Sequence, residues 1–139
     1  MTSRTLILLD GLYAIVRLAR DAPVPDWVPR EPVVSITRTT DELSIVCDES
    51  RVPPGVTCSR GWCALRVQGA MDLSETGVLA SIATPLARGG VNIFALSTYD
   101  TDYLLIPHQF LDRAGVLLSS EGHAVLWPHG PAPFSHSLA

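Results

Sequence analysis

Between residues 62 and 127 the apolar residues switch repeatedly between a period of two, typical of strands, and a period near 3.6, typical of helices. This alternation constrains the fold more than any other feature, because a segment with one period cannot adopt the other structure without exposing its apolar face. The expected elements are, in order, a strand at Trp62–Gln68, a helix ending at Gly89-Gly90, strands at Val91–Ser97 and Tyr103–Ile106, a helix from Pro107 to Gly122, and a strand at His123–Trp127.

This order, strand–helix–strand–strand–helix–strand, predicts an α+β fold of the ferredoxin-like βαββαβ type, with two helices on one face of a four-stranded antiparallel sheet. We expect the domain to span 61–127. Its first helix should start near Asp72–Glu75, where an acid followed three residues later by Glu forms a capping-box pattern. Pro85 predicts a kink or a poorly formed last turn in that helix.

The first half of the chain, 1–60, looks like a divergent copy of the second. Ile36–Val46 has the pattern of Leu96–Ile106, sixty positions later, and Leu12–Leu18 precedes Trp62–Gln68 by about fifty. Prolines should shorten both helices of this copy to turns. Leu6–Leu18 also fits a two-residue hairpin at Asp10-Gly11 that adds a small strand, and we expect a flexible tail at 128–139.

Composition excludes several classes of protein. All ten basic residues are arginine, so the chain alone cannot supply the lysine of a Schiff-base enzyme, a P-loop or a protein kinase. The net charge of −4 comes without a basic stripe, which argues against nucleic-acid binding. No apolar run reaches the roughly 18 residues of a membrane span. We therefore expect a cytoplasmic protein with no membrane and no nucleic-acid partner.

Cysteine and histidine do not have the spacing of metal sites. The three cysteines, Cys47, Cys58 and Cys63, lack a CxxC pair and are expected to be reduced thiols. The four histidines show no ligand pattern, and no nucleophile with a base and a supporting third group is present. We predict no metal, no cofactor and no catalytic residues, and hence not an enzyme.

Two polar segments are candidates for a binding site. Gly69–Val78 enters a helix, and helix N-termini offer free N–H groups that suit a carboxylate; alternatively, its acids only cap the helix. Ser97–Tyr103 joins two strands and is rich in acids and hydroxyls that could hold a cation; alternatively, it is a solvated turn. The predicted fold brings the two segments together, with donors in one and acceptors in the other, as an α-amino acid requires.

These segments carry a resemblance. Trp62–Gly69, Asp72–Ile82 and Gly90–Leu105 resemble an ACT domain, a βαββαβ ligand-binding module that regulates amino-acid metabolism. The whole chain is similar to short bacterial tandem-ACT proteins, in which 1–60 would be the divergent N-terminal ACT-like domain. These are related to aspartokinase regulatory domains and to the arginine sensor of TOR signalling.

The resemblance implies an amino acid bound at the junction of ACT units. It assigns as ligand-binding residues Asp72, Ser74, Glu75, Thr76, Gly77, Val78, Thr98, Tyr99, Asp100 and Asp102. It implies an allosteric regulator or sensor, with a possible protein partner or a homo-oligomer formed through sheet or helix packing. Two alternatives stay open: an interaction module that keeps the ACT fold without a ligand, and a regulatory subunit of an amino-acid biosynthetic enzyme such as aspartokinase.

Overall fold

The computed structural model describes residues 3–69 and 72–127; the tail expected at 128–139 lies outside the described residues. The chain divides into two compact units. The N-terminal unit holds residues 11–62, and the C-terminal unit holds residues 63–127 together with the described residues of 1–10. The N-terminal strand therefore belongs to the C-terminal unit, whereas the sequence placed it in a domain of residues 1–60.

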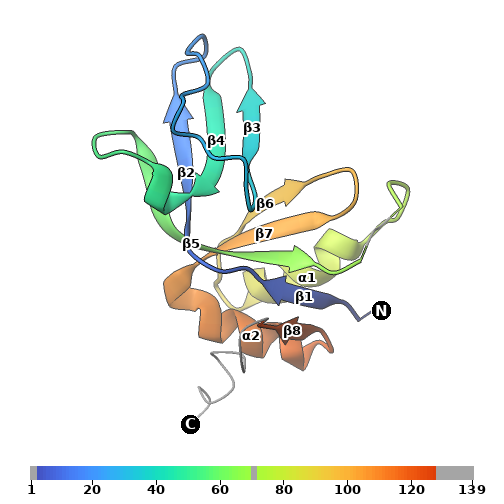
Figure 1. The fold of residues 1–139 in the computed structure, drawn as a ribbon. Coiled ribbons are helices and arrows are strands. Elements are labelled where there is room, and N and C mark those ends of the chain that lie inside the picture. Colours follow the sequence, from blue (N-terminus) through green and yellow to red (C-terminus); the bar gives the residue numbers. More distant parts are fainter. Residues whose placement is uncertain (1–2, 70–71, 128–139) are drawn as a thin grey trace. The chain divides into compact units, whose positions relative to one another are not determined.

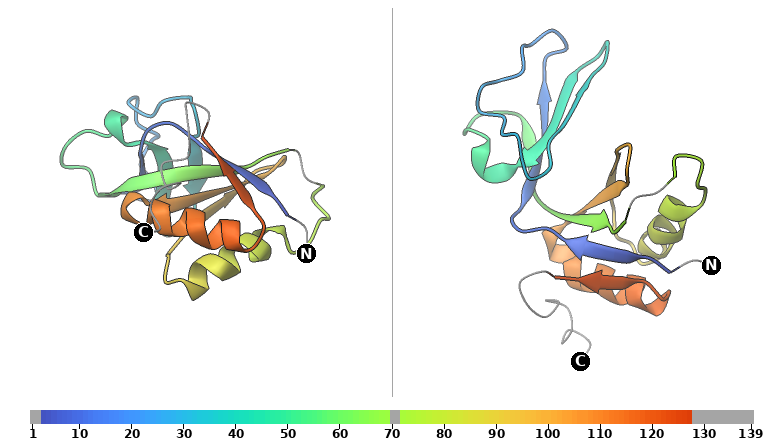
Figure 2. Two further views of the ribbon diagram at one scale, coloured as in Figure 1. Left: turned by 90° about the horizontal axis from the view of Figure 1, so that it is seen from below. Right: turned by 45° about the vertical axis from the view of Figure 1, so that its right-hand side comes forward.

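The C-terminal unit is an α+β fold in which two helices lie on one face of a sheet (Figure 2). The sheet order is β8-β1-β5-β7-β6. Its elements are β1 (Thr5–Leu8), the second half of β5 (Cys58–Val67), α1 (Val78–Arg88), β6 (Phe94–Ser97), β7 (Asp102–Pro107), η2 (His108–Phe110), α2 (Leu111–Ser120) and β8 (Ala124–Leu126). The order strand–helix–strand–strand–helix–strand that the apolar periods predict is confirmed from β5 to β8. The sheet has one strand more than the four predicted, because β1 joins it and pairs parallel with β8.

Strand β1 lies between β5 and β8 (Figure 1). Leu6 faces Val67 in the antiparallel ladder to β5 and Val125 in the parallel ladder to β8. The hairpin expected at Asp10-Gly11 is therefore wrong, although the extra strand exists. Leu6 and Leu8 are buried, and a strand this apolar is most stable inside a sheet, where both of its edges are already paired.

Helix α1 runs through Pro85 to Arg88. Proline has no N–H, so the Ser81 carbonyl cannot receive its usual bond from residue 85. Buried His123 replaces that donor, because its Nε2 lies 3.1 Å from the Ser81 oxygen. Its Nδ1 accepts the Arg4 N–H at 3.0 Å, which fixes the proton on Nε2. One imidazole thus completes the helix and holds the start of β1.

The N-terminal unit is a small sheet in the order β3-β4-β2-β5. Its elements are β2 (Tyr13–Leu18), β3 (Ser35–Arg38), β4 (Leu43–Asp48), η1 (Glu49–Arg51) and the first half of β5. Residues 11–62 contain no α-helix. A turn closed by the Val28 N–H and the Pro25 carbonyl stands where a first helix would be, and η1 ends before Pro53-Pro54. Ala14, Val16, Leu43 and Ile45 are core residues.

The two units share one repeated segment. The bounds of β6, β7 and η2 follow those of β3, β4 and η1 at a constant offset of 59 residues, one less than the sequence pattern indicated. Strand registers agree as well: Ser35 faces Val46, and Phe94 faces Leu105. The common plan is therefore a hairpin followed by a 3₁₀ turn.

Candidate functional site

A hollow of about 310 Å³ lies on the C-terminal unit between the segment that enters α1 and the turn that joins β6 to β7. Eight of the ten residues proposed from the sequence line it: Asp72, Glu75, Gly77, Val78, Thr98, Tyr99, Asp100 and Asp102. Ser74 and Thr76 belong to the same segment but do not line the hollow. Five further residues that were not proposed line it: Leu73, Leu79, Ala80, Ser97 and Thr101.

The first wall is a loop followed by the start of α1. The helix begins at Val78, not near Asp72–Glu75, so the expected capping box is wrong. Asp72 instead accepts hydrogen bonds from the Ser74 N–H at 2.9 Å and the Ser74 hydroxyl at 2.8 Å. The hydrogen bond from the Ser74 N–H lowers the pKa of the Asp72 carboxyl most, and the hydrogen bond from the Ser74 hydroxyl lowers it further. Asp72 therefore stabilises the loop itself rather than the end of the helix.

Gly77 is the N-cap of α1, and it has a φ of 78°. A left-handed backbone of this kind favours glycine, and glycine has no side chain that could bond the helix N-terminus. The first intrahelical bond runs from the Ser81 N–H to the Gly77 carbonyl at 2.9 Å. The amides before Ser81 thus begin the helix without intrahelical acceptors. Val78, Leu79 and Ala80 line the hollow, so this wall suits an anion.

The second wall is a tight turn from Thr98 to Thr101. The Thr98 N–H donates to the Thr101 carbonyl at 2.8 Å, and the Thr98 hydroxyl accepts from the Thr101 N–H at 3.2 Å. The Thr101 hydroxyl then donates to the Val67 carbonyl at 2.7 Å and is buried. The sequence predicted a longer loop, because it lacks the Asn-Gly or Asp-Gly pair of a common tight hairpin. The turn is tight nevertheless, because the Thr98 side chain closes it.

The lining of the hollow carries four acids and no basic residue. Asp102 accepts the Ser97 hydroxyl at 2.6 Å, and Glu75 forms an ion pair with Arg4. Asp100 has no hydrogen-bond or ion-pair partner within 3–69 and 72–127. Two of the four acids, Asp100 in the turn and Asp102 at the start of β7, lie opposite the amides of α1, and the other two lie on the first wall.

Two large apolar side chains line the hollow and are exposed to solvent. Leu73 is 68% exposed on the first wall, and Tyr99 is 79% exposed on the second. Both side chains are therefore available to contact a ligand in the hollow. Tyr99 is among the residues proposed from the sequence, whereas Leu73, which lies between Asp72 and Ser74, is not.

Sequence reasoning also missed Arg4, the ion-pair partner of Glu75. It lies 71 positions before Glu75, and no local pattern could connect the two residues. Thr101 was inside the polar run, and the signal that could have found it was its place at the end of a turn, where a hydroxyl commonly bonds backbone.

None of the three cysteines lines the hollow. Cys47, Cys58 and Cys63 are free. Burial raises the pKa of the Cys47 and Cys63 thiols, which makes them poor nucleophiles. Among the described residues, no three His, Cys, Asp or Glu side chains are grouped as metal ligands.

No helix within the described part of the chain has the length and apolar character needed to cross a membrane.

Comparison with known proteins identifies the class. The ACT domain family model matches residues 57–120, and a second model, described as an N-terminal domain, matches residues 11–55. Residues 57–120 therefore form an ACT domain, which belongs to a class of regulatory ligand-binding domains.

Among particular proteins, the chain is similar to one from Agobacterium tumefaciens whose X-ray structure has a TM-score of 0.88 at 39% identity, covering 94% of this chain and 97% of that one. The human protein CASTOR3P is 30% identical over 67% of this chain and 64% of its own length, so the chain spans less than two thirds of that relative. The regulatory subunit of aspartate kinase from Thermus thermophilus shares the fold, with a TM-score of 0.54 at 11% identity, over 84% of this chain and 96% of that one.

Proposed function

We propose that this chain is a non-catalytic sensor that binds a free amino acid in the hollow of its C-terminal unit. One observation carries the proposal: the hollow has the amides of a helix start on one wall and an acidic turn on the other. An α-amino acid has a carboxylate and an ammonium on one carbon, and the two walls complement these two charges.

In this arrangement the ligand carboxylate lies at the amides of Val78 to Ala80, and the ammonium lies at Asp100 and Asp102. Asp100 is the stronger acceptor, because the Asp102 carboxylate already receives the Ser97 hydroxyl. Leu73 and Tyr99 cover the ligand side chain and lose solvent exposure on binding. Their burial contributes affinity in proportion to the apolar area removed from water.

Binding would act by population shift. A ligand held between two segments that are far apart in the sequence favours the conformation in which both walls are in place, and a partner that recognises that conformation reads the signal. Amino-acid binding therefore needs no catalytic group on this chain.

A thermal-shift screen of the twenty amino acids tests the proposal. A ligand at 100 times its Kd adds about 2.7 kcal/mol to stability, which raises the Tm of a chain of this size by roughly 10 °C. Asp100→Asn should abolish the shift, because it removes the unpaired carboxylate of the turn.

The chain provides a matched control. Asp41 holds the same position in the N-terminal turn as Asp100 does in the C-terminal turn, so Asp41→Asn should leave the shift intact. If no amino acid raises the Tm, or if Asp100→Asn and Asp41→Asn respond alike, the proposal fails.

A second candidate function is that of a regulatory subunit for an amino-acid biosynthetic enzyme. The fold of the Thermus thermophilus regulatory subunit, matched over 96% of that chain, favours it. On this hypothesis the sensor acts on a separate catalytic chain, and co-purification with an aspartate kinase from the same organism, strengthened or weakened by the bound amino acid, tests it. Failure to co-purify leaves the stand-alone sensor as the better description.

A further inference from the structure

One arginine outside the lining of the hollow controls the charge of the site. Arg4 precedes β1 and forms an ion pair with Glu75 on the first wall. Both side chains are partly shielded from water, with 19% of Arg4 and 34% of Glu75 exposed. A pair that is partly buried is screened less than a surface pair, so Arg4 cancels much of the charge of Glu75 at the hollow.

Arg4 is fixed in this position by its backbone. Its N–H donates to His123 Nδ1 at 3.0 Å, and its carbonyl accepts from the Ala124 N–H at 3.0 Å. His123 is in turn bound to the Ser81 carbonyl of α1. The backbone of Arg4 is therefore tied to β8 and, through His123, to the helix that forms the first wall.

The Arg4 guanidinium is engaged on one side only. Its Nε is buried and has no hydrogen-bond partner among the described residues, while its Nη2 contacts Glu75 Oε2. An arginine embedded in a full network would serve structure first, whereas this one directs its charge at a single carboxylate of the hollow.

We infer that Arg4 is the residue that sets the selectivity of the site between neutral and cationic amino acids. This rests on the proposed function. Of the four lining acids, Asp100 in the turn and Asp102 at the start of β7 serve the α-ammonium. Asp72 and Glu75 are on the opposite wall, where Asp72 already accepts two hydrogen bonds from Ser74. Glu75 could therefore attract a second, side-chain cation. Arg4 occupies that carboxylate and repels such a cation. The wild-type site therefore does not favour an amino acid with a cationic side chain over one with a neutral side chain.

Lysine and norleucine test this selectivity, because they differ by the terminal ammonium. The measured quantity is the ratio of the norleucine Kd to the lysine Kd, obtained by calorimetry at low salt. Arg4→Gln frees Glu75 and should raise the ratio about tenfold. Glu75→Gln leaves Arg4 uncompensated and should lower it about tenfold. The double variant restores neutrality and should return the ratio close to the wild-type value.

Arg88→Gln is the matched control, since Arg88 is an exposed arginine in the last turn of α1 and its loss should leave the ratio unchanged. A purely structural role for Arg4 would weaken both ligands equally. A ratio that stays within twofold of wild type in folded Arg4→Gln overturns the inference alone. If Arg4→Gln does not fold, Glu75→Gln decides, and an unchanged ratio there overturns the inference too. If none of the twenty amino acids binds wild type, the proposed function fails and the inference fails with it.

Discussion

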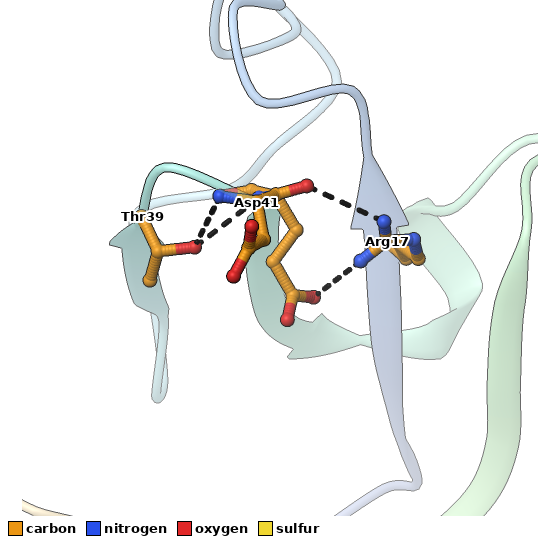
Figure 3. Close-up of polar contacts among 4 residues, drawn as sticks. Arg17, Thr39 and Asp41 are labelled. Atoms are coloured by element: carbon orange, nitrogen blue, oxygen red, sulfur yellow. Dashed lines mark hydrogen bonds and ion pairs between the residues drawn. The ribbon is translucent and has the colours of Figure 1, made fainter.

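The turns at 39–42 and 98–101 have the same place in the repeated hairpin and the same local design, but different surroundings. In each, a threonine at the first position donates its N–H to the fourth residue, and its hydroxyl accepts an N–H from the turn. In the N-terminal turn, Arg17 then contacts the Asp41 carbonyl and the Glu42 carboxylate (Figure 3). In the C-terminal turn, Thr101 is tied to β5.

This difference is why we propose a binding site at the C-terminal turn and not at the N-terminal one. The N-terminal turn is already contacted by guanidinium groups of its own unit, since Arg20 also donates to the Thr40 carbonyl. Its unit has no α-helix within 11–62, and therefore no helix start to form a second wall. The C-terminal turn keeps Asp100 unpaired among the described residues and has α1 beside it.

The largest expected effect concerns the wall that only the C-terminal unit has. His123→Ala removes the donor to the Ser81 carbonyl and the acceptor of the Arg4 N–H, so two partly buried backbone groups lose their partners. We expect the free energy of unfolding to fall by about 3 kcal/mol, measured by urea denaturation. Adding Pro85→Ala returns an N–H to the helix and should recover part of the loss; no recovery would mean that His123 does not replace the missing donor.

A smaller effect is expected where the C-terminal turn is fixed to the sheet. Thr101→Val keeps the shape of the side chain but leaves the buried Val67 carbonyl without its hydroxyl donor. The free energy of unfolding should fall by about 1.5 kcal/mol. Thr40→Val, in the exposed N-terminal turn, is the control and should change it by less than about 0.5 kcal/mol. Equal losses would contradict the idea that only one turn is anchored by burial.

The ion pair of the N-terminal turn should contribute less still. Arg17 Nη1 and Glu42 Oε1 lie 3.1 Å apart, and the two side chains are 58% and 38% exposed. Arg17→Ala should lower the free energy of unfolding by about 0.5 kcal/mol or less, and the loss should shrink as salt rises. A loss comparable to that of Thr101→Val would show that the arginine holds this turn as firmly as the buried hydroxyl holds the other.

The smallest effect concerns Asp72, whose pKa is lowered by Ser74. Because the folded pKa lies below the unfolded one, about 3.9, its contribution to stability is present above the unfolded pKa and is lost as pH falls through the folded pKa. Ser74→Ala removes the hydrogen bond from the hydroxyl but keeps the one from the backbone N–H. In an NMR titration the Asp72 pKa should therefore rise only part of the way toward its unfolded value. Ser50 makes the same two bonds to Asp48 in the N-terminal unit, and Ser50→Ala should leave the Asp72 pKa unchanged.

Much of the C-terminal unit could be predicted from the sequence. The apolar periods identified its helices and strands, and the two polar runs marked both walls of the hollow. The predicted start of α1 is wrong, because Asp72 and Glu75 have the spacing of a capping box while Asp72 bonds Ser74 and the helix begins at Val78, after Gly77. Local spacing cannot distinguish an acid that caps a helix from one that closes a turn before it.

The sequence by itself determined the order of elements, the repeated hairpin and the polar segments, since each depends on neighbours within one or two turns of chain. Only the tertiary structure decided that β1 enters the sheet between β5 and β8, that His123 supplies the bond Pro85 cannot make, and that Arg4 offsets Glu75. These outcomes depend on which distant strand edge, carbonyl or charge is close in space. Hydrophobic and electrostatic contacts of this kind carry no signature in local sequence.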